Sequence, residues 1–466
     1  MTPRTQRLLL AVSAPVLALL AAFVITSLVL IVAGDPVGDV WGQLLSWPET
    51  RNWANIINNA TVLYLSGVAV AIGFRMNLFN IGVDGQYRVA AFTAAVVAGE
   101  AWLPGYLNTV LAVLAFVVAG VIASLVLLIS GDSVSAFWDV MFSWPGSRNI
   151  VSMLNTTALL YLSGVAAAIG FRMNLFNIGV EGQYRIAAFA GAAFAGEAWL
   201  PGKLNTVAAV LIAMAVGALW AGIAGVLRVT RGVSEVISTI MLNAIAGSLI
   251  TYFILKIGVS NGNARNTKPI PEGSRVGSLK LFGDSPTELY GLALLAVVVG
   301  VGFWVLLNRT RFGFDLRAAG SSESAAVASG VDVKRMIVIA MLLSGAVAGL
   351  VGLPTMFSDS YAYGSAFQTG LGFTGIAVAL LGRNNPIGIA LGALIFAFLN
   401  EQATLLNILA GISPDIVYVT QGVIVLAVVI AYAIVGRYRV RLEQAQVADE
   451  LSSQRRQAAQ AEGVAS

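Results

Sequence analysis

Long apolar runs separated by short polar segments recur along nearly the whole chain. A helix needs roughly 20 residues to cross the ~30 Å hydrocarbon core of a bilayer, and many of these runs approach or exceed that length. They lie near 8–33, 55–74, 107–130, 152–171, 204–228, 235–256, 289–308, 336–353, 364–382, 386–404 and 415–436. The pattern predicts an all-α fold, a polytopic bundle of transmembrane helices.

Two further apolar stretches are shorter, and each carries a glutamate. Residues 87–103 contain Glu100, and residues 184–200 contain Glu197. A charged side chain inside an apolar helix is costly in lipid. We therefore expect these stretches to be broken or half-crossing helices.

The N-terminal part of the chain contains a tandem duplication. Residues 63–92 match residues 160–189 at 27 of 30 positions. Repeats in transporters are usually weak in sequence, so near-identity indicates a recent duplication. We divide the chain into a duplicate of the first membrane segments at 1–106, with two or three helices, a transmembrane core at 107–436 and a cytosolic tail at 437–466.

The duplication poses a topological problem. If each copy crossed the membrane three times, the two copies would enter it in opposite orientations. Their arginines are nevertheless the same, Arg75 and Arg88 in one copy and Arg172 and Arg185 in the other. Either 87–103 does not span, or the N-terminus lies outside, or the first copy packs irregularly. We expect the second copy to be the working one.

The formal charge of +4 does not indicate nucleic-acid binding, because the arginines and lysines are scattered between apolar runs. Cytoplasmic loops of membrane proteins are enriched in Lys and Arg. Arg228, Arg231, the segment 309–335 and Arg383 fall where one alternating topology requires cytoplasm, whereas 257–288 falls outside. We predict a multi-pass protein of the bacterial cytoplasmic membrane.

Composition excludes several kinds of chemistry. The chain has no cysteine and no histidine, which removes disulfides, Cys/His zinc sites and triads that use either residue. No G-x-x-x-x-G-K-[ST] phosphate loop occurs. We expect no enzyme activity, no metal and no cofactor, and any ATP that drives transport must be hydrolysed by another chain.

One polar, glycine-rich segment, 171–183, lies between two apolar helices. Non-helical backbone at membrane depth must be buried in protein or line a water-filled path. Two interpretations remain open, a capped cytoplasmic turn and a membrane-embedded element at the translocation path or near a partner contact. For the second, the candidate path residues are Arg172, Asn174, Asn177, Glu181, Gln183 and, in the span at 235–256, Asn243.

The longest charged stretch between two predicted spans is 308–335. A short helix is predicted from about Ser322 to Ser329, with Ser321 or Ser322 as its N-cap and Gly330 as its stop. Such a helix, parallel to the membrane and flanked by arginines, offers a docking surface for a soluble partner. The alternative is an ordinary loop.

Several motifs occur together between residues 107 and 436. They are FNIGVEGQ at 176–183, Arg231-Gly232 with Glu235 and Asn243, DLRAAG at 315–320 with Ala325-Ala326 and Gly330, and SGAVAGLVG at 344–352. Together they resemble the permease subunits of nucleoside-type ABC importers, within the branched-chain amino acid and simple sugar permease superfamily. Residues 1–106 depart from that pattern.

The resemblance implies a function, a set of partners and a coupling site. The function is translocation of a small polar solute with ATP hydrolysed by a partner. A nucleoside is the preferred candidate for that solute and a sugar the second. The partners are an ABC ATPase subunit, a second homologous permease subunit and an extracytoplasmic substrate-binding lipoprotein, around a core of about ten helices. The region that couples to the ATPase is 315–330, with Asp315, Arg317, Gly320, Glu323, Ala325 and Gly330 as its candidate residues.

An ion-coupled secondary transporter is the competing interpretation. It would need a driving-force site of its own, for which Glu181 and Glu401 are the acidic candidates. A membrane-embedded enzyme has no supporting set of acids, metal ligands or nucleophiles. A neighbouring gene for an ATPase with phosphate loops would favour the importer.

Overall fold

The computed structural model describes residues 20–46 and 123–422, apart from 263, 284 and 366, together with five isolated positions at 16, 56, 60, 121 and 424. The chain divides into two compact units, Met1–Pro104 and Gly105–Ser466. Our predictions for 61–103 and for the tail at 437–466 lie outside the described residues.

The described part of the first unit repeats a local structure of the second. Helix 20–33 leads through Gly34 into α2 (Val37–Leu44), and Trp41 donates to Ser27 Oγ at 3.0 Å. In the second unit, Gly131 leads into α6 (Val134–Met141), and Trp138 donates to Ser124 Oγ at 3.0 Å. Each glycine has a positive φ, which its missing Cβ permits. The duplication therefore folds alike in both copies over these residues.

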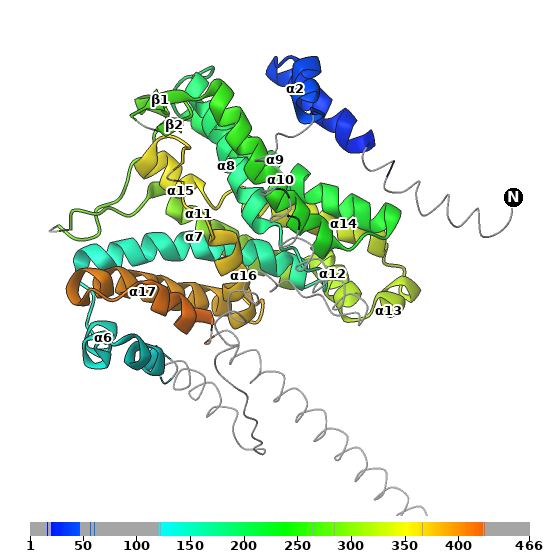
Figure 1. Cartoon of the computed structure of the whole chain (residues 1–466). Coiled ribbons are helices and arrows are strands. Elements are labelled where there is room, and N and C mark those ends of the chain that lie inside the picture. Colours follow the sequence, from blue (N-terminus) through cyan, green and yellow to red (C-terminus); the bar gives the residue numbers. More distant parts are fainter. Residues whose placement is uncertain are drawn as a thin grey trace, which may run out of the picture. The chain divides into compact units, whose positions relative to one another are not determined.

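The other described residues of the second unit form mainly helices, joined by loops and one small hairpin (Figure 1). Its long helices are α7 (Ser147–Phe171), α8 (Val180–Glu197), α9 (Gly202–Arg231), α10 (Glu235–Ile257), α11 (Leu294–Arg309), α14 (Val333–Ala348) and α17 (Pro386–Ala410). The shorter elements are α12 (Arg311–Ser321), α13 (Glu323–Ala328), α15 (Leu353–Thr355), α16 (Leu371–Leu381), the one-turn elements η1 (Glu272–Ser274), η2 (Gly291–Ala293) and η3 (Met356–Ser360), and strands β1 (Val259–Asn261) and β2 (Ala264–Asn266). These elements confirm the all-α class.

Six of the described helices are long and apolar enough to cross a membrane. They are Ser147–Phe171, Gly202–Arg231, Glu235–Ile257, Gly291–Arg309, Val333–Ser360 and Pro386–Ala410. Each coincides with a run that the sequence predicts as a span. The chain is a multi-pass protein of the bacterial cell membrane.

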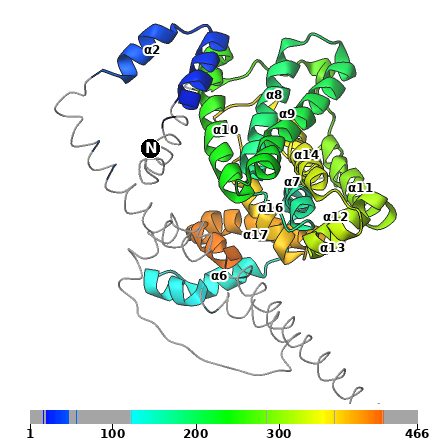
Figure 2. The same cartoon turned by 90° about the vertical axis from the view of Figure 1, so that its right-hand side faces the viewer.

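Small residues let the central helices approach closely. Figure 2 shows α8, α9 and α14 running beside one another. A Cβ at Gly217 of α9 would overlap the carbonyl of Gly345 on α14, and a Cβ at Gly349 would overlap the carbonyl of Ala213. Lipid gives helices no hydrophobic reason to associate, so close backbone packing of this kind stabilises the bundle.

One predicted span, 364–382, and one stretch predicted to be broken or half-crossing, 184–200, need correction. Within 364–382 only the 11 residues of α16 are helical, which gives about 16 Å of helix at 1.5 Å per residue and half-crosses a bilayer. The described residues between Tyr361 and Gly370 form no helix or strand. Their backbone is held by hydrogen bonds from a neighbouring segment, for example from Thr267 N to the Tyr363 carbonyl. Conversely, 184–200 is not broken, because α8 is one continuous helix of 18 residues.

The described helices of the second unit share two recognisable ends. At the coupling end, α12 packs on the turn after α7, because a Cβ at Gly320 would overlap the Arg172 carbonyl. At the distal end, Lys268 Nζ bonds Glu197 Oε2 at 2.8 Å, and Thr267 N donates to the Tyr363 carbonyl at 2.8 Å. Figure 1 accordingly shows α12 and α13 far from β1 and β2.

Candidate functional site

A cluster of polar side chains lies inside the helix bundle, where the segment between α7 and α8 folds back into it. Asn177 and Gln183, both fully buried, exchange two amide hydrogen bonds of 3.0 and 2.8 Å. Asn177 Nδ2 also donates to Ser344 Oγ at 2.8 Å. Ser344 lies about 16 Å along α14 from Val333, so Asn177 lies well inside the bundle and not at the end of α14.

Asn243 extends this cluster onto α10. Its Nδ2 donates to the Ile178 carbonyl at 2.9 Å, and its Oδ1 accepts from Gly182 N at 2.8 Å. Both partners are backbone groups that the break between α7 and α8 leaves without helical bonds. A Cβ at Gly182 would lie 2.8 Å from the Asn243 Cα, so the residue must be glycine for the two helices to meet here.

Glu181 connects the cluster to the half-crossing helix α16. Its side chain is 5% exposed, and its two oxygens accept from Gly370 N and Gly372 N, each at 2.9 Å. The Tyr184 hydroxyl lies 3.2 Å from the same carboxylate, and its single proton is shared between Glu181 and the nearer Gln368 carbonyl at 2.8 Å. A carboxylate at the N-terminus of a helix accepts hydrogen bonds from the free N–H groups there. Its negative charge also interacts favourably with the positive end of the helix dipole. Glu181 therefore fixes where α16 begins within the membrane.

Four of the six predicted path residues are brought together in this cluster, and two are not. Arg172 instead lies at the coupling end, where its Nε donates to the Asn384 carbonyl at 2.9 Å. Burial, and then the charge of Arg317, lower the pKa of Arg172. Asn174 is exposed in a left-handed turn with φ of 57°. The segment 171–183 is thus a turn at its start and a membrane-embedded element from Asn177 onward.

The predicted coupling segment forms two helices at the coupling end. In α13, Ser322 Oγ accepts from Ala325 N at 3.3 Å and Gly330 follows with φ of 83°, as the sequence predicts. The longer helix α12 was not predicted. Its N-cap is Thr310, whose Oγ1 accepts from Gly313 N at 3.0 Å, and a threonine is one of the residues favoured at that position.

The candidate coupling residues occupy different positions on these helices. Asp315 lies 3.8 Å from Arg311, one helical turn away. Within the described part of the chain, Nη1 of Arg317 is buried without a hydrogen-bond partner. Glu323 is 63% exposed, and Ala325 and Gly330 are exposed too.

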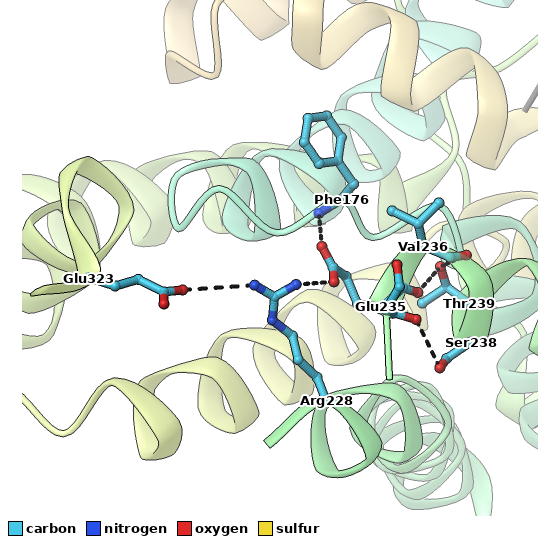
Figure 3. Close-up of polar contacts among 8 residues, drawn as sticks. Phe176, Arg228, Glu235, Val236, Ser238, Thr239 and Glu323 are labelled. Carbon is cyan, nitrogen blue, oxygen red and sulfur yellow. Dashed lines mark hydrogen bonds and ion pairs between the residues drawn. The ribbon is translucent and has the colours of Figure 1, made fainter. Parts of the chain in front are cut away.

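A chain of charges joins α13 to the buried cluster (Figure 3). Glu323 lies 3.8 Å from Arg228 at the end of α9, and Arg228 pairs with Glu235 at the start of α10. Glu235, 4% exposed, accepts from Phe176 N at 3.2 Å, directly before Asn177. Sequence reasoning used Arg228 only as a marker of the cytoplasmic side and noted Ser344 and Glu235 only within motifs. It did not predict that Arg228 pairs with Glu235 or that Ser344 contacts Asn177.

We predict that this charge chain transmits movement from α13. Changing Glu235 to Gln removes the charge that holds Arg228 but keeps the shape, and should lower transport at least fivefold. Loss of one member of a buried ion pair costs ~3–5 kcal/mol, although the 30% exposure of Arg228 reduces this. The measurement is uptake in vesicles, with Glu288→Gln at the distal end as a control. Wild-type uptake in the Glu235 variant would contradict the assignment.

These features describe a bundle of apolar, membrane-length helices with a buried polar cluster inside it and an exposed helical segment, α12 and α13, at one end. The family model described as branched-chain amino acid transport system / permease component matches residues 149–429. The chain belongs to this family of permeases, and the match begins in the second copy of the duplication.

Three curated relatives match most of their own length. A guanosine ABC transporter permease protein of Bacillus subtilis, NupP, is 35% identical over 67% of this chain and 90% of the relative. A glucose ABC transporter permease protein of Haloferax volcanii, TsgB13, is 32% identical over 73% and 90%. A nucleoside ABC transporter permease protein of Lactococcus lactis, NupB, is 31% identical over 69% and 90%.

Proposed function

We propose that this chain is the permease subunit of an ABC importer that carries nucleosides across the cytoplasmic membrane. Relatives named for guanosine and for nucleosides support the substrate class, and a glucose relative makes a sugar the second candidate. The observation that carries the proposal is the buried polar cluster tied through Glu235 to an exposed docking helix. An ion-coupled transporter has no use for such a docking helix.

The proposed mechanism follows the contacts. An ATPase seated on α12 and α13 would displace Glu323 and Arg228 when it changes conformation, and Glu235 would pass that movement to Phe176. Asn177 and Glu181 follow in the same segment, and Glu181 holds the N-terminus of α16. The two ends of the bundle would thereby open alternately around a fixed mid-membrane site.

The partners are assigned to the two ends. The ABC ATPase docks at the coupling end, which faces the cytoplasm because it holds the arginines of 309–335. The extracytoplasmic substrate-binding lipoprotein docks at the distal end. A second homologous permease subunit completes the path. No nucleic acid takes part.

The second copy of the duplication is proposed to be the working one. The family match begins at residue 149, and the first unit ends at Pro104, close to our boundary at 106. Deleting residues 10–106 should therefore leave uptake within about twofold of wild type, because residues 107–436 keep an even set of crossings. The measurement is uptake at matched membrane expression. Loss of uptake with normal membrane insertion would show that the first copy is needed.

The experiment that tests the function uses the complete complex in proteoliposomes. Labelled guanosine uptake is measured with unlabelled nucleosides, glucose and branched-chain amino acids as competitors. The proposal expects competition by nucleosides alone and no ATP turnover by the permease without its ATPase. Uptake of labelled glucose but not of labelled guanosine would replace the nucleoside with a sugar, and uptake of neither would refute the proposal.

A further inference from the structure

A small cavity with polar walls opens at the distal end, and nothing in the sequence analysis assigns it a role. Its volume is about 270 Å³, close to the ~300 Å³ lower limit of small-molecule sites. It lies between the end of α14, the turn η3, the path from Tyr361 to α16, and β2. The lining residues are Asn266, Gly352, Thr355, Asp359, Ser360, Ala362, Gly364, Phe367, Gln368 and Leu371.

The walls of this distal cavity are rigidly built. Ile270 N donates to the Tyr361 carbonyl at 2.7 Å, and Tyr363 N donates to Thr267 Oγ1 at 3.0 Å. Tyr361 is left-handed with φ of 52° and follows a π-helical turn, Met356–Ser360. Such turns are frequent at functional sites. The Arg275 guanidinium lies 4.1 Å from the Tyr361 ring and covers it from outside.

The lining offers the two kinds of group that recognise a nucleoside. Phe367 provides an aromatic ring, whose own position is fixed by Tyr363 at a centroid distance of 4.3 Å. Asp359 is an exposed carboxylate that has no hydrogen bond or ion pair within the described residues. A carboxylate accepts two donors at once, as the ribose diol or the N1–H and N2–H of guanine present them. Asn266 and Gln368 supply amides that donate and accept.

The charge of the cavity narrows the ligand class. The lining residues include one carboxylate and no lysine or arginine. An anionic solute, such as a nucleotide or a free carboxylate, would face Asp359 without a counter-charge. A neutral solute can satisfy both groups if it has an aromatic ring to place against Phe367 and two neighbouring hydrogen-bond donors to place on Asp359.

The cavity also leads toward the buried polar cluster. Leu371 and Gln368 line it, and the Gln368 carbonyl accepts from Tyr184 OH at 2.8 Å. The same hydroxyl lies 3.2 Å from Glu181, which holds the start of α16. A ligand on this wall would therefore touch the element that Glu181 positions.

From this geometry we infer that the distal cavity is the site where a nucleoside released at the outer face first binds the permease, with its base against Phe367 and its paired donors on Asp359. The inference rests on the proposed function. It assigns Asp359, Phe367, Asn266 and Gln368 as substrate contacts.

The test compares Asp359→Asn and Phe367→Leu with wild type in the complete reconstituted complex. Both variants should lower the initial rate of guanosine uptake at least tenfold while basal ATP hydrolysis stays within twofold, because neither residue touches the coupling end. The control is Glu272→Gln, a carboxylate that is 90% exposed at the same end and outside the cavity. It should transport as wild type does.

A second readout separates binding from a general defect. Wild type should take up guanosine faster than 2′,3′-dideoxyguanosine or inosine, and Asp359→Asn should reduce at least one of these ratios. Since the binding lipoprotein is the same in every sample, a changed ratio comes from the permease.

The possible outcomes separate the two proposals. Wild-type uptake in Asp359→Asn, or an equal loss in Glu272→Gln, would overturn the cavity assignment while the function stands. A wild-type complex that takes up glucose but no nucleoside would refute the substrate class, and with it the nucleoside site. If Phe367→Leu fails to assemble, the near-isosteric Asp359→Asn still tests whether the distal cavity binds substrate.

Discussion

Changing Glu181 to glutamine is expected to reduce transport by at least tenfold, although the two side chains have nearly the same shape. The carboxylate accepts from Gly370 N and Gly372 N, one to each oxygen, and the Tyr184 hydroxyl lies 3.2 Å away. A glutamine offers one oxygen, and its NH₂ group would face a backbone N–H that also needs an acceptor. A buried donor left without a partner costs ~1–3 kcal/mol, and the lost bond is charge-assisted. Uptake and basal ATP hydrolysis are measured together.

The first copy of the duplication supplies the matched control for this change. Asp84 occupies the position that corresponds to Glu181, so Asp84→Asn removes an equivalent carboxylate. We expect Asp84→Asn to transport within twofold of wild type, because the second copy forms the working core. Equal losses in the two variants would mean that the first copy belongs to the transport machine.

Replacing Gly320 is expected to uncouple ATP hydrolysis from transport. A Cβ at this position would overlap the Arg172 carbonyl and lie 3.0 Å from Met173 Cα. Both neighbours are backbone atoms that cannot swing aside, and overpacking of this kind costs ~1–3 kcal/mol. Gly320→Ala should therefore push α12 away from the turn after α7, and Gly320→Trp should do so more strongly. Uptake should fall at least tenfold while membrane insertion stays normal.

The control for this change is a glycine with free space around it. A Cβ added at Gly302 of α11 would have no other atom within 4 Å. Gly302→Ala should therefore transport as wild type does. Both ATP hydrolysis stimulated by the loaded binding lipoprotein and uptake are measured. Unchanged uptake in Gly320→Trp would exclude α12 as the coupling element.

The sequence predicts the membrane helices better than the segments between them. Apolar runs alone locate the six long spans, and a serine N-cap locates α13, because both signals are local. The prediction of a full membrane-spanning helix at 364–382 was wrong, because apolar composition does not distinguish a helix from irregular backbone. Thr267 hydrogen-bonds Tyr363, directly before that run, and Glu181 accepts from Gly370 N within it.

The candidate site was predictable only in part. Asn177, Glu181, Gln183 and Asn243 are polar residues in apolar surroundings, and such residues must find one another inside the bundle. Arg172 and Asn174 follow the same pattern, but the turn places them outside the cluster. The link from Phe176 to Glu235 spans 59 residues, and no local pattern announces a contact made by tertiary packing.

One measurement tests the central claim most directly, namely the energy source of uptake by the complete complex in sealed vesicles. The chain, its partner permease, the ATPase and the binding lipoprotein are reconstituted, and labelled guanosine uptake is followed with ATP on the coupling side. Our account predicts uptake that requires hydrolysable ATP, persists when ionophores dissipate all ion gradients and disappears when the ATPase is omitted. Uptake driven by an ion gradient without ATP would contradict it and make the protein a secondary transporter.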